Sequence, residues 1–303
     1  MLGFLKKRIE GYVRNCILPN VAERTTAQVV NAWHREQLMQ SALHCQEPGI
    51  AQAKEGETPL IVSLTTHGER LYEVCIAIES ILQGSVKPNA IVLWLGENEP
   101  AQLPESLQRQ AKRGLTIRRT RDLRSYTKLV PALQQYAAAD IVTIDDDILY
   151  PLDFLENLLA VHRLRPEAIV ANMVMRLTRA DDGVPEGIKQ WPYTLEMRTT
   201  ADADLYFEGF GGVLYPAGSL PRETLNESVF SAISPTNDDA WFNAMARLAG
   251  RPIVLCNLHP YDYIGAVNPN GQSLALYHTN STAENLNDKQ IRRVWEHYQL
   301  HGK

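Results

Sequence analysis

The sequence lacks the features that mark zinc proteins, disulfide-stabilised proteins and membrane-spanning proteins. Its 303 residues include four widely separated cysteines and no CxxC pair: Cys16, Cys45, Cys75 and Cys256. This spacing argues against a structural zinc site or a disulfide framework and fits a reducing cytosol. No apolar run approaches the length of a transmembrane helix, and the N-terminus lacks the continuous apolar stretch of a signal peptide. We therefore expect a cytoplasmic protein.

An excess of basic residues is also missing. The net charge is −5, with 45% hydrophobic and 21% charged residues, which is ordinary for a soluble globular protein. This charge argues against general nucleic-acid binding, which needs many phosphate contacts, but it permits a local basic pocket for a small phosphorylated ligand. The length suits one large α/β domain, or one domain with an appendage.

The most distinctive stretch is residues 141–147, where Ile-Val-Thr-Ile runs directly into Asp145, Asp146 and Asp147. The apolar part has the length and composition of a buried strand. Three carboxylates where such a strand ends are electrostatically costly unless a cation lies there, and hard divalent ions prefer oxygen ligands. The alternative is a solvated acidic turn. The triplet alone leaves both interpretations open.

The surrounding pattern predicts an α/β fold with a mainly parallel, doubly wound sheet. Strands are expected at 60–65, 90–95, 115–119 and 141–144, and helices at 69–83, 104–112 and 128–139. Further on we expect a helix at 152–164, a strand at 168–175, a long polar segment at 176–204 and a short strand at 253–256. Ligands bind at the carboxyl ends of strands in such sheets, which is where the aspartates fall.

The first 58 residues are predicted to be a helical appendage that ends in a polar linker. Residues 1–20 place apolar side chains on one helical face and Lys6, Lys7, Arg8 and Arg14 mostly around the rest. Such a helix can lie on an anionic membrane, and residues 1–46 can equally dock on the protein itself or on a second subunit. Residues 59–303 form the main domain, with a first half at 59–150 and a second at 151–303.

An ordered set of motifs in residues 60–290 resembles GT-A-type glycosyltransferases. It is most similar to bacterial enzymes of capsule and lipopolysaccharide glycan synthesis, in the family 2-like group. The motifs are Ser63-Leu64-Thr65-Thr66 with Arg70, Lys87-Pro88, Asp122 with Tyr126 and Lys128, Asp145-Asp146-Asp147, Gly211-Gly212-Val213-Leu214-Tyr215-Pro216, Asp238-Asp239-Ala240-Trp241 and Asn287-Asp288-Lys289-Gln290. The resemblance implies a GT-A (Rossmann-like) fold and sugar transfer from a nucleotide-diphosphate donor, with a UDP-sugar favoured. The implied acceptor is a glycan or a lipid-linked oligosaccharide.

The resemblance also implies a divalent ion, Mn²⁺ or Mg²⁺, at the leaving diphosphate. Asp147 is its expected ligand, Asp145 is a ligand or ribose partner, and His278 could be a third ligand, although a surface or core histidine is the alternative. The implied nucleotide-sugar-binding residues are Thr65, Thr66, Arg70, Asp122, Tyr126, Lys128, Asp145, Asp146 and Lys289. Each has an ordinary alternative, as a helix cap, a solvated side chain or, for Asp122, a partner of nearby arginines.

An inverting transfer also needs a base for the acceptor hydroxyl. Asp239 is the expected base with Asp238 as rival, although adjacent acids at a helix start can simply cap it. The expected sugar-binding residues are Trp191, Gly211, Gly212, Tyr215 and Trp241, with the aromatics equally suited to the core. A retaining transferase, a nucleotidyltransferase and a non-catalytic glycan-binding or scaffold protein are the competing hypotheses.

Overall fold

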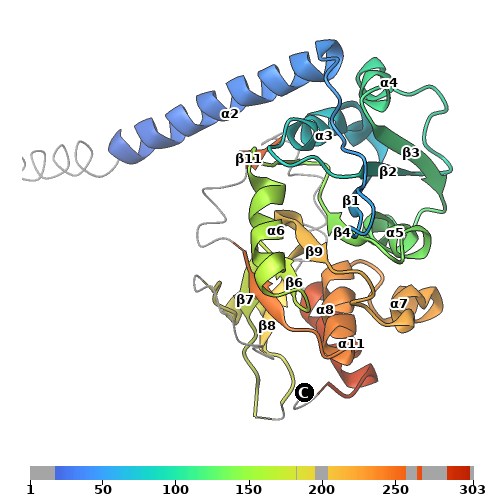
Figure 1. Cartoon of the computed structure of the whole chain (residues 1–303). Coiled ribbons are helices and arrows are strands. Elements are labelled where there is room, and N and C mark those ends of the chain that lie inside the picture. Colours follow the sequence, from blue (N-terminus) through green and yellow to red (C-terminus); the bar gives the residue numbers. More distant parts are fainter. Residues whose placement is uncertain (1–17, 182, 195–203, 257–264, 268–284, 301–303) are drawn as a thin grey trace, which may run out of the picture.

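The computed structural model describes residues 18–181, 183–194, 204–256, 265–267 and 285–300. Its centre is a seven-stranded sheet in the order β10-β6-β9-β4-β1-β2-β3 (Figure 1). Every pairing in this sheet is parallel except those of β9, which runs antiparallel to both β4 and β6. The predicted α/β fold with a mainly parallel sheet is confirmed, and it is consistent with the GT-A fold that the resemblance implied.

The central sheet contains these strands: β1 (Leu60–Thr66), β2 (Ala90–Gly96), β3 (Leu115–Thr120), β4 (Asp140–Thr143), β6 (Ile169–Ala171), β9 (Val213–Tyr215) and β10 (Ile253–Leu255). Two further pairs lie outside it: β5 (Ile148–Leu149) with β11 (Gly265–Ala266), and β7 (Val174–Arg176) with β8 (Leu205–Phe207).

The α-helices are α2 (Leu18–His44), α3 (Val74–Leu82), α4 (Glu105–Ala111), α5 (Val130–Gln135), α6 (Phe154–Leu164), α7 (Glu227–Ile233), α8 (Asp238–Leu248) and α11 (Leu286–His297). Short 3-10 helices are η2 (Gly68–Tyr72), η3 (Arg124–Lys128), η4 (Ile188–Gln190), η5 (Gly209–Gly211) and η6 (Arg222–Leu225). None of the helices in the described ranges combines the length and the apolar character needed to cross a bilayer.

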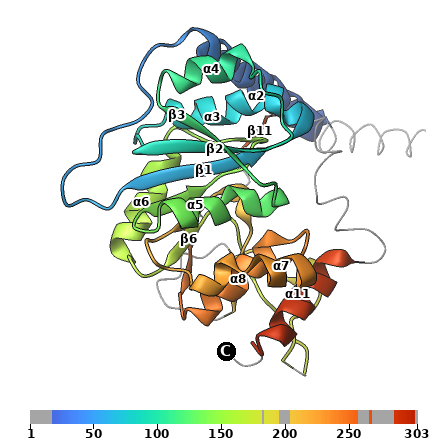
Figure 2. The same ribbon diagram turned by 90° about the vertical axis from the view of Figure 1, so that its right-hand side faces the viewer.

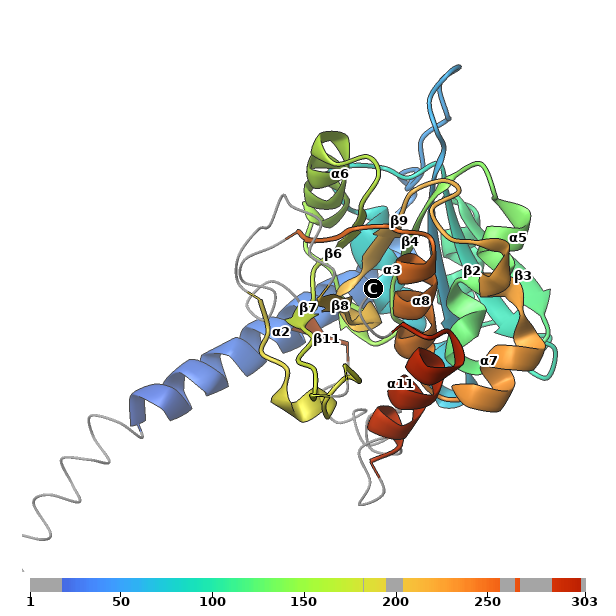
Figure 3. The ribbon, with the colours of Figure 1, turned by 90° about the horizontal axis from the view of Figure 1, so that it is seen from below.

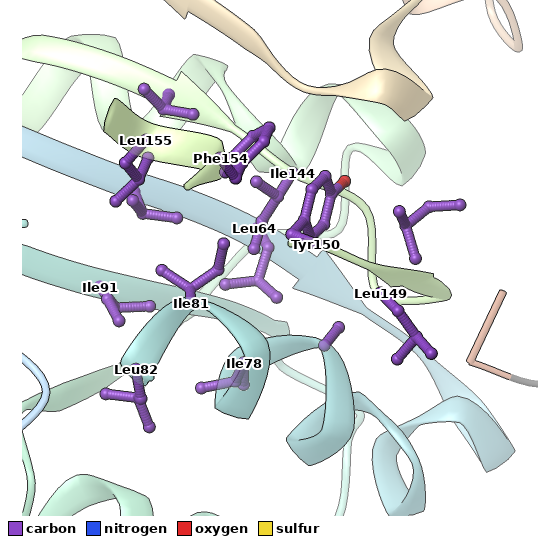
Figure 4. Close-up of a cluster of buried hydrophobic side chains, with 14 of the residues drawn as sticks. Leu64, Ile78, Ile81, Leu82, Ile91, Ile144, Leu149, Tyr150, Phe154 and Leu155 are labelled. Atoms are coloured by element: carbon purple, nitrogen blue, oxygen red, sulfur yellow. The ribbon is translucent and has the colours of Figure 1, made fainter. Parts of the chain in front are cut away.

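The two faces of the sheet carry separate apolar cores. One core joins α3, α4 and α6 to the sheet, and the other joins α5, α7, α8 and α11 to it. Figure 2 shows α3 and α4 on one side of β1 and β2 and α5 and α8 on the other. Figure 4 shows the first core, where Tyr150 and Phe154 lie beside Ile144 and Leu64. Buried strands with apolar side chains on both faces are expected when helices cover both sides of a sheet.

In the described part of the N-terminal region, helix α2 packs on the main domain near its C-terminal end. Leu38 and Ala42 near the end of α2 are buried in the core with α3 and α4. The earlier turns extend away from the body, as Figures 1 and 3 show. The predicted polar linker is held against the domain, since Gly49 N–H donates to the carbonyl of Arg113 at 2.9 Å.

Two local predictions were wrong, and one strand was not predicted. Residues 168–175 do not form one strand, because the chain turns after β6 and residues from Val174 on pair with β8 instead. The predicted helix at 128–139 is shorter, with η3 before it and α5 ending at Gln135. Strand β9 was not predicted. Its three residues follow the glycine-rich segment directly, and a strand this short gives no clear alternation in sequence.

Candidate active site

The polar residues of interest meet where β1 and β4 end. β4 pairs with β1 up to Ser63–Thr143, and the aspartates follow two residues later. Because β9 runs the opposite way and pairs Val213 with Thr143, the residues just before β9 come to the same edge. The N-terminus of α8 joins them there through contacts with Lys128 and Gly209. Chain topology thus brings residues around 66, 128, 146, 209 and 239 together.

Asp146 is the fixed member of the triplet. Its side chain is 7% exposed, and it accepts hydrogen bonds from Thr66 Oγ1 at 2.6 Å and from Arg70 Nη1 at 2.8 Å. Arg70 also forms an ion pair with Asp147, with Nη2 3.3 Å from Oδ2. Burial raises the pKa of Asp146, while Arg70 and Thr66 oppose that shift. Thr66 and Arg70 therefore anchor the acidic segment to the end of β1.

Lys128 joins two groups of acids, the triplet Asp145–Asp147 and the pair Asp238 and Asp239. Its ammonium donates to Asp145 Oδ1 at 2.8 Å and forms an ion pair with Asp238 Oδ2 at 3.4 Å, while the side chain is almost fully buried. Burial lowers the pKa of Lys128, but Asp145, Asp238 and Asp239 together raise it well above its usual value. Lys128 is also fixed through its carbonyl, which accepts a hydrogen bond from Ser63 Oγ at 2.5 Å. The lysine is therefore held charged between the acids.

Asp239 lies at the start of α8, where Asn237 caps the helix by accepting a hydrogen bond from Ala240 N–H at 2.9 Å. The Asp239 side chain is partly exposed, and its Oδ1 accepts a hydrogen bond from Gly209 N–H at 3.0 Å. Burial and the neighbouring Asp238 raise the pKa of Asp239 well above its usual value, against the opposing effect of Lys128. Asp238 is buried instead and faces Lys128.

The site carries more negative than positive charge. Among the residues that the structure describes, four carboxylates pair with only two cations, Arg70 and Lys128, and Asp239 adds a fifth carboxylate that is bonded to Gly209 N–H. The imbalance is clearest at Asp147, which is partly exposed. Burial, Asp145 and Asp146 raise its pKa from 3.8 to about 6, although Arg70 opposes the shift. Such a site favours an additional cation.

The residues present fit a divalent ion that shares its coordination with a ligand. Asp145 and Asp147 are the two partly exposed members of the triplet, and two carboxylates with phosphate oxygens and water are a common magnesium arrangement. Within the described ranges no three His, Cys, Asp or Glu side chains are grouped to hold an ion by themselves. The predicted third ligand, His278, lies outside the described residues.

No protein-family model and no curated protein sequence matches the chain. Among solved structures it is similar to the mannosyltransferase PcManGT from Pyrobaculum calidifontis, in complex with GDP-Man and Mn²⁺. The two chains are 16% identical with a TM-score of 0.42, and the match covers 78% of this chain and 64% of that one. A likeness at this level implies nothing about substrate or reaction, so both are inferred from the site's own residues.

Three of the other predicted donor residues lie at or near the surface. Thr65 is partly exposed, and its hydroxyl donates to the carbonyl of Trp94 at 3.0 Å. Asp122 is exposed after β3 and accepts a hydrogen bond from Arg124 N–H at 2.7 Å. Lys289 is exposed in the first turn of α11, the helix that packs beside α8. All three remain predictions.

The aromatic side chains predicted to face a ligand are core residues instead. Tyr126, Trp191, Tyr215 and Trp241 are at most 3% exposed. Tyr126 stacks on Phe230 and donates its hydroxyl hydrogen to the carbonyl of Ser234. Their faces are covered by protein, and none is available to a nucleotide or sugar ring in this structure.

Gly211 and Gly212 are fixed by packing, and their predicted contact with sugar stays a prediction. A Cβ on Gly211 would lie 2.4 Å from Met173 Cγ. Gly212 has a φ of +87°, and a Cβ there would lie 2.4 Å from the Phe154 ring. Both glycines are needed because the backbone passes tightly over the core.

Sequence reasoning missed several residues that shape the site. Gly209 contacts Asp239, and Glu208 before it is partly buried, with a raised pKa and a hydrogen bond from the Tyr193 hydroxyl at 2.6 Å. Tyr150 accepts a hydrogen bond from Asp145 N–H at 2.9 Å. The available signal was the position of these residues within or next to motifs already noted, but only the fold shows which atoms meet.

Proposed function

We propose that the protein is a metal-dependent glycosyltransferase that uses a nucleotide-diphosphate sugar. The observation that carries this proposal is the pairing of Lys128 with one acid from each of two groups, Asp145 and Asp238. A transferase needs one group to hold the leaving diphosphate and a second to take the acceptor proton, close enough to act on one sugar. The site supplies two acidic groups joined by a single ammonium.

On the donor side, Asp147 and Asp145 would hold the divalent ion. When bound, the ion would neutralise charge that develops on the leaving diphosphate. Arg70 and Lys128 are the cations within reach of these acids and suit contact with phosphate oxygens. Asp146 has a supporting role, since both of its oxygens are already bonded to Thr66 and Arg70.

On the acceptor side, Asp239 is the proposed base of an inverting transfer. The acceptor oxygen attacks the anomeric carbon, the bond to the diphosphate breaks, and Asp239 takes the hydroxyl proton. Asp239 suits this role better than Asp238 because it is partly exposed and its raised pKa makes it a stronger base. Asp238 is buried against Lys128.

A donor screen tests the proposal. UDP-, GDP-, CMP- and dTDP-sugars are incubated with Mn²⁺ or Mg²⁺, and hydrolysis and transfer are both measured. Asp147→Asn should abolish the metal-dependent signal. Asp239→Asn should abolish transfer while nucleotide and metal binding persist. Glu167→Gln, at an exposed glutamate paired with Arg165, is the control.

The proposal fails if no sugar nucleotide is turned over or bound, or if Asp147→Asn retains full activity. The anomeric configuration of the product shows whether the enzyme inverts or retains. A retained configuration would contradict the role of Asp239 as base. UDP-sugars are the first donors to test. The proposed acceptor is a glycan or lipid-linked oligosaccharide of bacterial surface-polysaccharide synthesis.

We further propose that α2 docks the enzyme on an anionic membrane, where lipid-linked acceptors lie. Val29, Val30 and Trp33 are 62%, 57% and 64% exposed on the 27-residue helix α2, whose earlier turns extend from the body (Figure 1). The sequence before α2 carries four basic residues and one acidic residue, in a chain whose net charge is −5. Exposed apolar side chains beside a basic segment match membrane-surface helices.

Liposome sedimentation tests this docking. Binding to vesicles that contain anionic lipid should weaken in a Val30→Ser/Trp33→Ser variant and at high salt. Leu164→Ser is the matched control because Leu164 is 77% exposed on α6. If the wild type does not bind vesicles but forms a dimer by light scattering, and the double variant is monomeric, α2 is a subunit interface instead.

A further inference from the structure

Residues 209–212, hereafter the glycine segment, connect the two acidic groups through hydrogen bonds. At one end, the carbonyl of Phe210 accepts a hydrogen bond from the Tyr150 hydroxyl at 3.1 Å. The same hydroxyl accepts a hydrogen bond from Asp145 N–H at 2.9 Å. The backbone that begins the aspartate triplet is therefore linked, through one side chain, to the glycine segment.

At its other end the glycine segment reaches the proposed base. Gly209 N–H donates to Asp239 Oδ1 at 3.0 Å. A Cβ on Gly209 would lie 2.8 Å from that same oxygen and 3.0 Å from Lys128 Nζ. A separation of 2.8 Å is shorter than a carbon–oxygen contact allows, so a Cβ at this position must displace the Asp239 carboxylate. Glycine at this position thus leaves the Asp239 carboxylate where the structure places it.

The glycine segment cannot move freely to absorb such a change. Gly212 N–H donates to the carbonyl of Gly209 at 3.0 Å, and Asn172 Nδ2 donates to the carbonyl of Gly211 at 3.1 Å. The backbone passes close to Met173 and Phe154, where no Cβ would fit. Tyr150 is held as firmly, because its ring is 1% exposed and packs in the core against Phe154 with centroids 4.4 Å apart (Figure 4).

We propose that the glycine segment and Tyr150 form a rigid spacer that sets the position of Asp239 relative to Asp145. Gly209 and Tyr150 are then positioning residues, which act through these two aspartates without touching substrate. This inference rests on the proposed function for its kinetic consequences. Positioning of this kind matters because a displacement of about 1 Å in a reacting group can cost roughly a hundredfold in rate.

Gly209→Ala tests the end at the base. The kcat of transfer should fall at least about tenfold, while KM for the donor and the dissociation constant of nucleotide with Mn²⁺ stay within about twofold. The Gly209 hydrogen bond lowers the pKa of Asp239. Weakening it should therefore move the acidic limb of the kcat/KM profile to higher pH, a shift that a purely structural defect would not produce.

Gly250→Ala is the matched control. Gly250 follows the same helix α8 at its opposite end, with a φ of +63° and no atom within 4 Å of the place that a Cβ would take. Its substitution strains the backbone without touching the site. It should lower the melting temperature and leave kcat and the pH profile unchanged. Equal losses in both variants, or wild-type kinetics in Gly209→Ala, would overturn the proposal.

Tyr150→Phe tests the other end, because it removes both hydrogen bonds and keeps the ring. Transfer should fall about tenfold at saturating donor. Tyr298→Phe is the control, since it deletes a hydroxyl bonded to Glu223 at 2.7 Å, just after α11. Wild-type transfer in a folded Tyr150→Phe variant would contradict a spacer role for Tyr150.

A measurement that does not depend on transferase activity separates this inference from the proposed function. If the wild type transfers no sugar, the proposed function fails, but the spacer can still be tested by ¹³C NMR titration of the Asp239 carboxyl group. Gly209→Ala should raise the pKa of Asp239, and Gly250→Ala should not. An unchanged Asp239 pKa in Gly209→Ala would refute the spacer whatever the activity.

Discussion

We expect the ionised side chain of Asp147 to destabilise the folded protein. Its pKa rises from 3.8 to about 6 in the folded state, mainly through burial and then through Asp145 and Asp146. Each pKa unit corresponds to about 1.4 kcal/mol, so the ionised carboxylate costs the fold roughly 3 kcal/mol. Asp147→Asn removes this charge. At pH 8 and without metal, we expect the variant to be more stable by up to about 3 kcal/mol, or roughly 5 to 10 °C in melting temperature.

The sign of the pH dependence follows from the direction of the shift. Between about pH 4 and pH 6 the folded protein keeps a proton on Asp147 that the unfolded chain has lost, so stability falls as pH rises through this window. Below about pH 4 both states are protonated and the penalty disappears. The advantage of Asp147→Asn should therefore be largest at pH 8 and small at pH 4.

Urea unfolding at both pH values measures the difference, with Asp181→Asn as an exposed control. Adding Mn²⁺ and UDP at pH 8 should stabilise the wild type, because binding to the folded state shifts the equilibrium, and should leave Asp147→Asn unaffected. If Asp147→Asn is less stable than the wild type at pH 8, or if it responds to metal equally, the assignment of strain and metal binding to Asp147 is refuted.

Three further predictions concern residues that hold the site or its scaffold. Lys128→Met leaves two acids without their cation and should cost about 3 kcal/mol at pH 7 by urea unfolding, while raising the pKa of Asp239; unchanged stability would contradict the bridging role. Arg113→Met leaves Glu79 fully buried and unpaired, so we expect a loss of about 3–5 kcal/mol with no change in Mn²⁺ affinity by calorimetry. Asn237→Ala removes the cap of α8 and should lower the melting temperature by an amount equivalent to about 1 kcal/mol.

The first half of the fold was predictable because its signals are local and regular. Apolar runs of strand length alternate with amphipathic stretches from residue 60 to 144, and the observed β1, β2 and β3 match within one residue at each end. The second half breaks this pattern. β9 enters the sheet between β4 and β6 from a distant part of the chain. Its pairing depends on tertiary contacts, which cannot be predicted from a sequence of three residues.

The site was predictable in its acids and much less so in their division of labour. Carboxylates at strand and helix ends are visible in sequence, which brought out Asp145–Asp147 and the Asp238-Asp239 pair. Which oxygen is already bonded is not visible, and so Asp146 was not recognised as an anchor. Aromatic side chains were misjudged for a related reason, since Trp241 has the same composition signal whether it lies in a cleft or at 0% exposure.

The charge balance of the site connects its stability to its proposed chemistry. Five carboxylates with two cations leave an unfavourable arrangement in the protein alone, as the raised pKa values of Asp147 and Asp239 show. A bound cation would favour ionisation of the first, and the acceptor hydroxyl would give its proton to the second. Under the proposed function, the same crowding that weakens the fold would favour metal binding at Asp147 and proton transfer to Asp239. Lys128 links the two groups of acids, because it is the one described side chain that pairs with an acid from each.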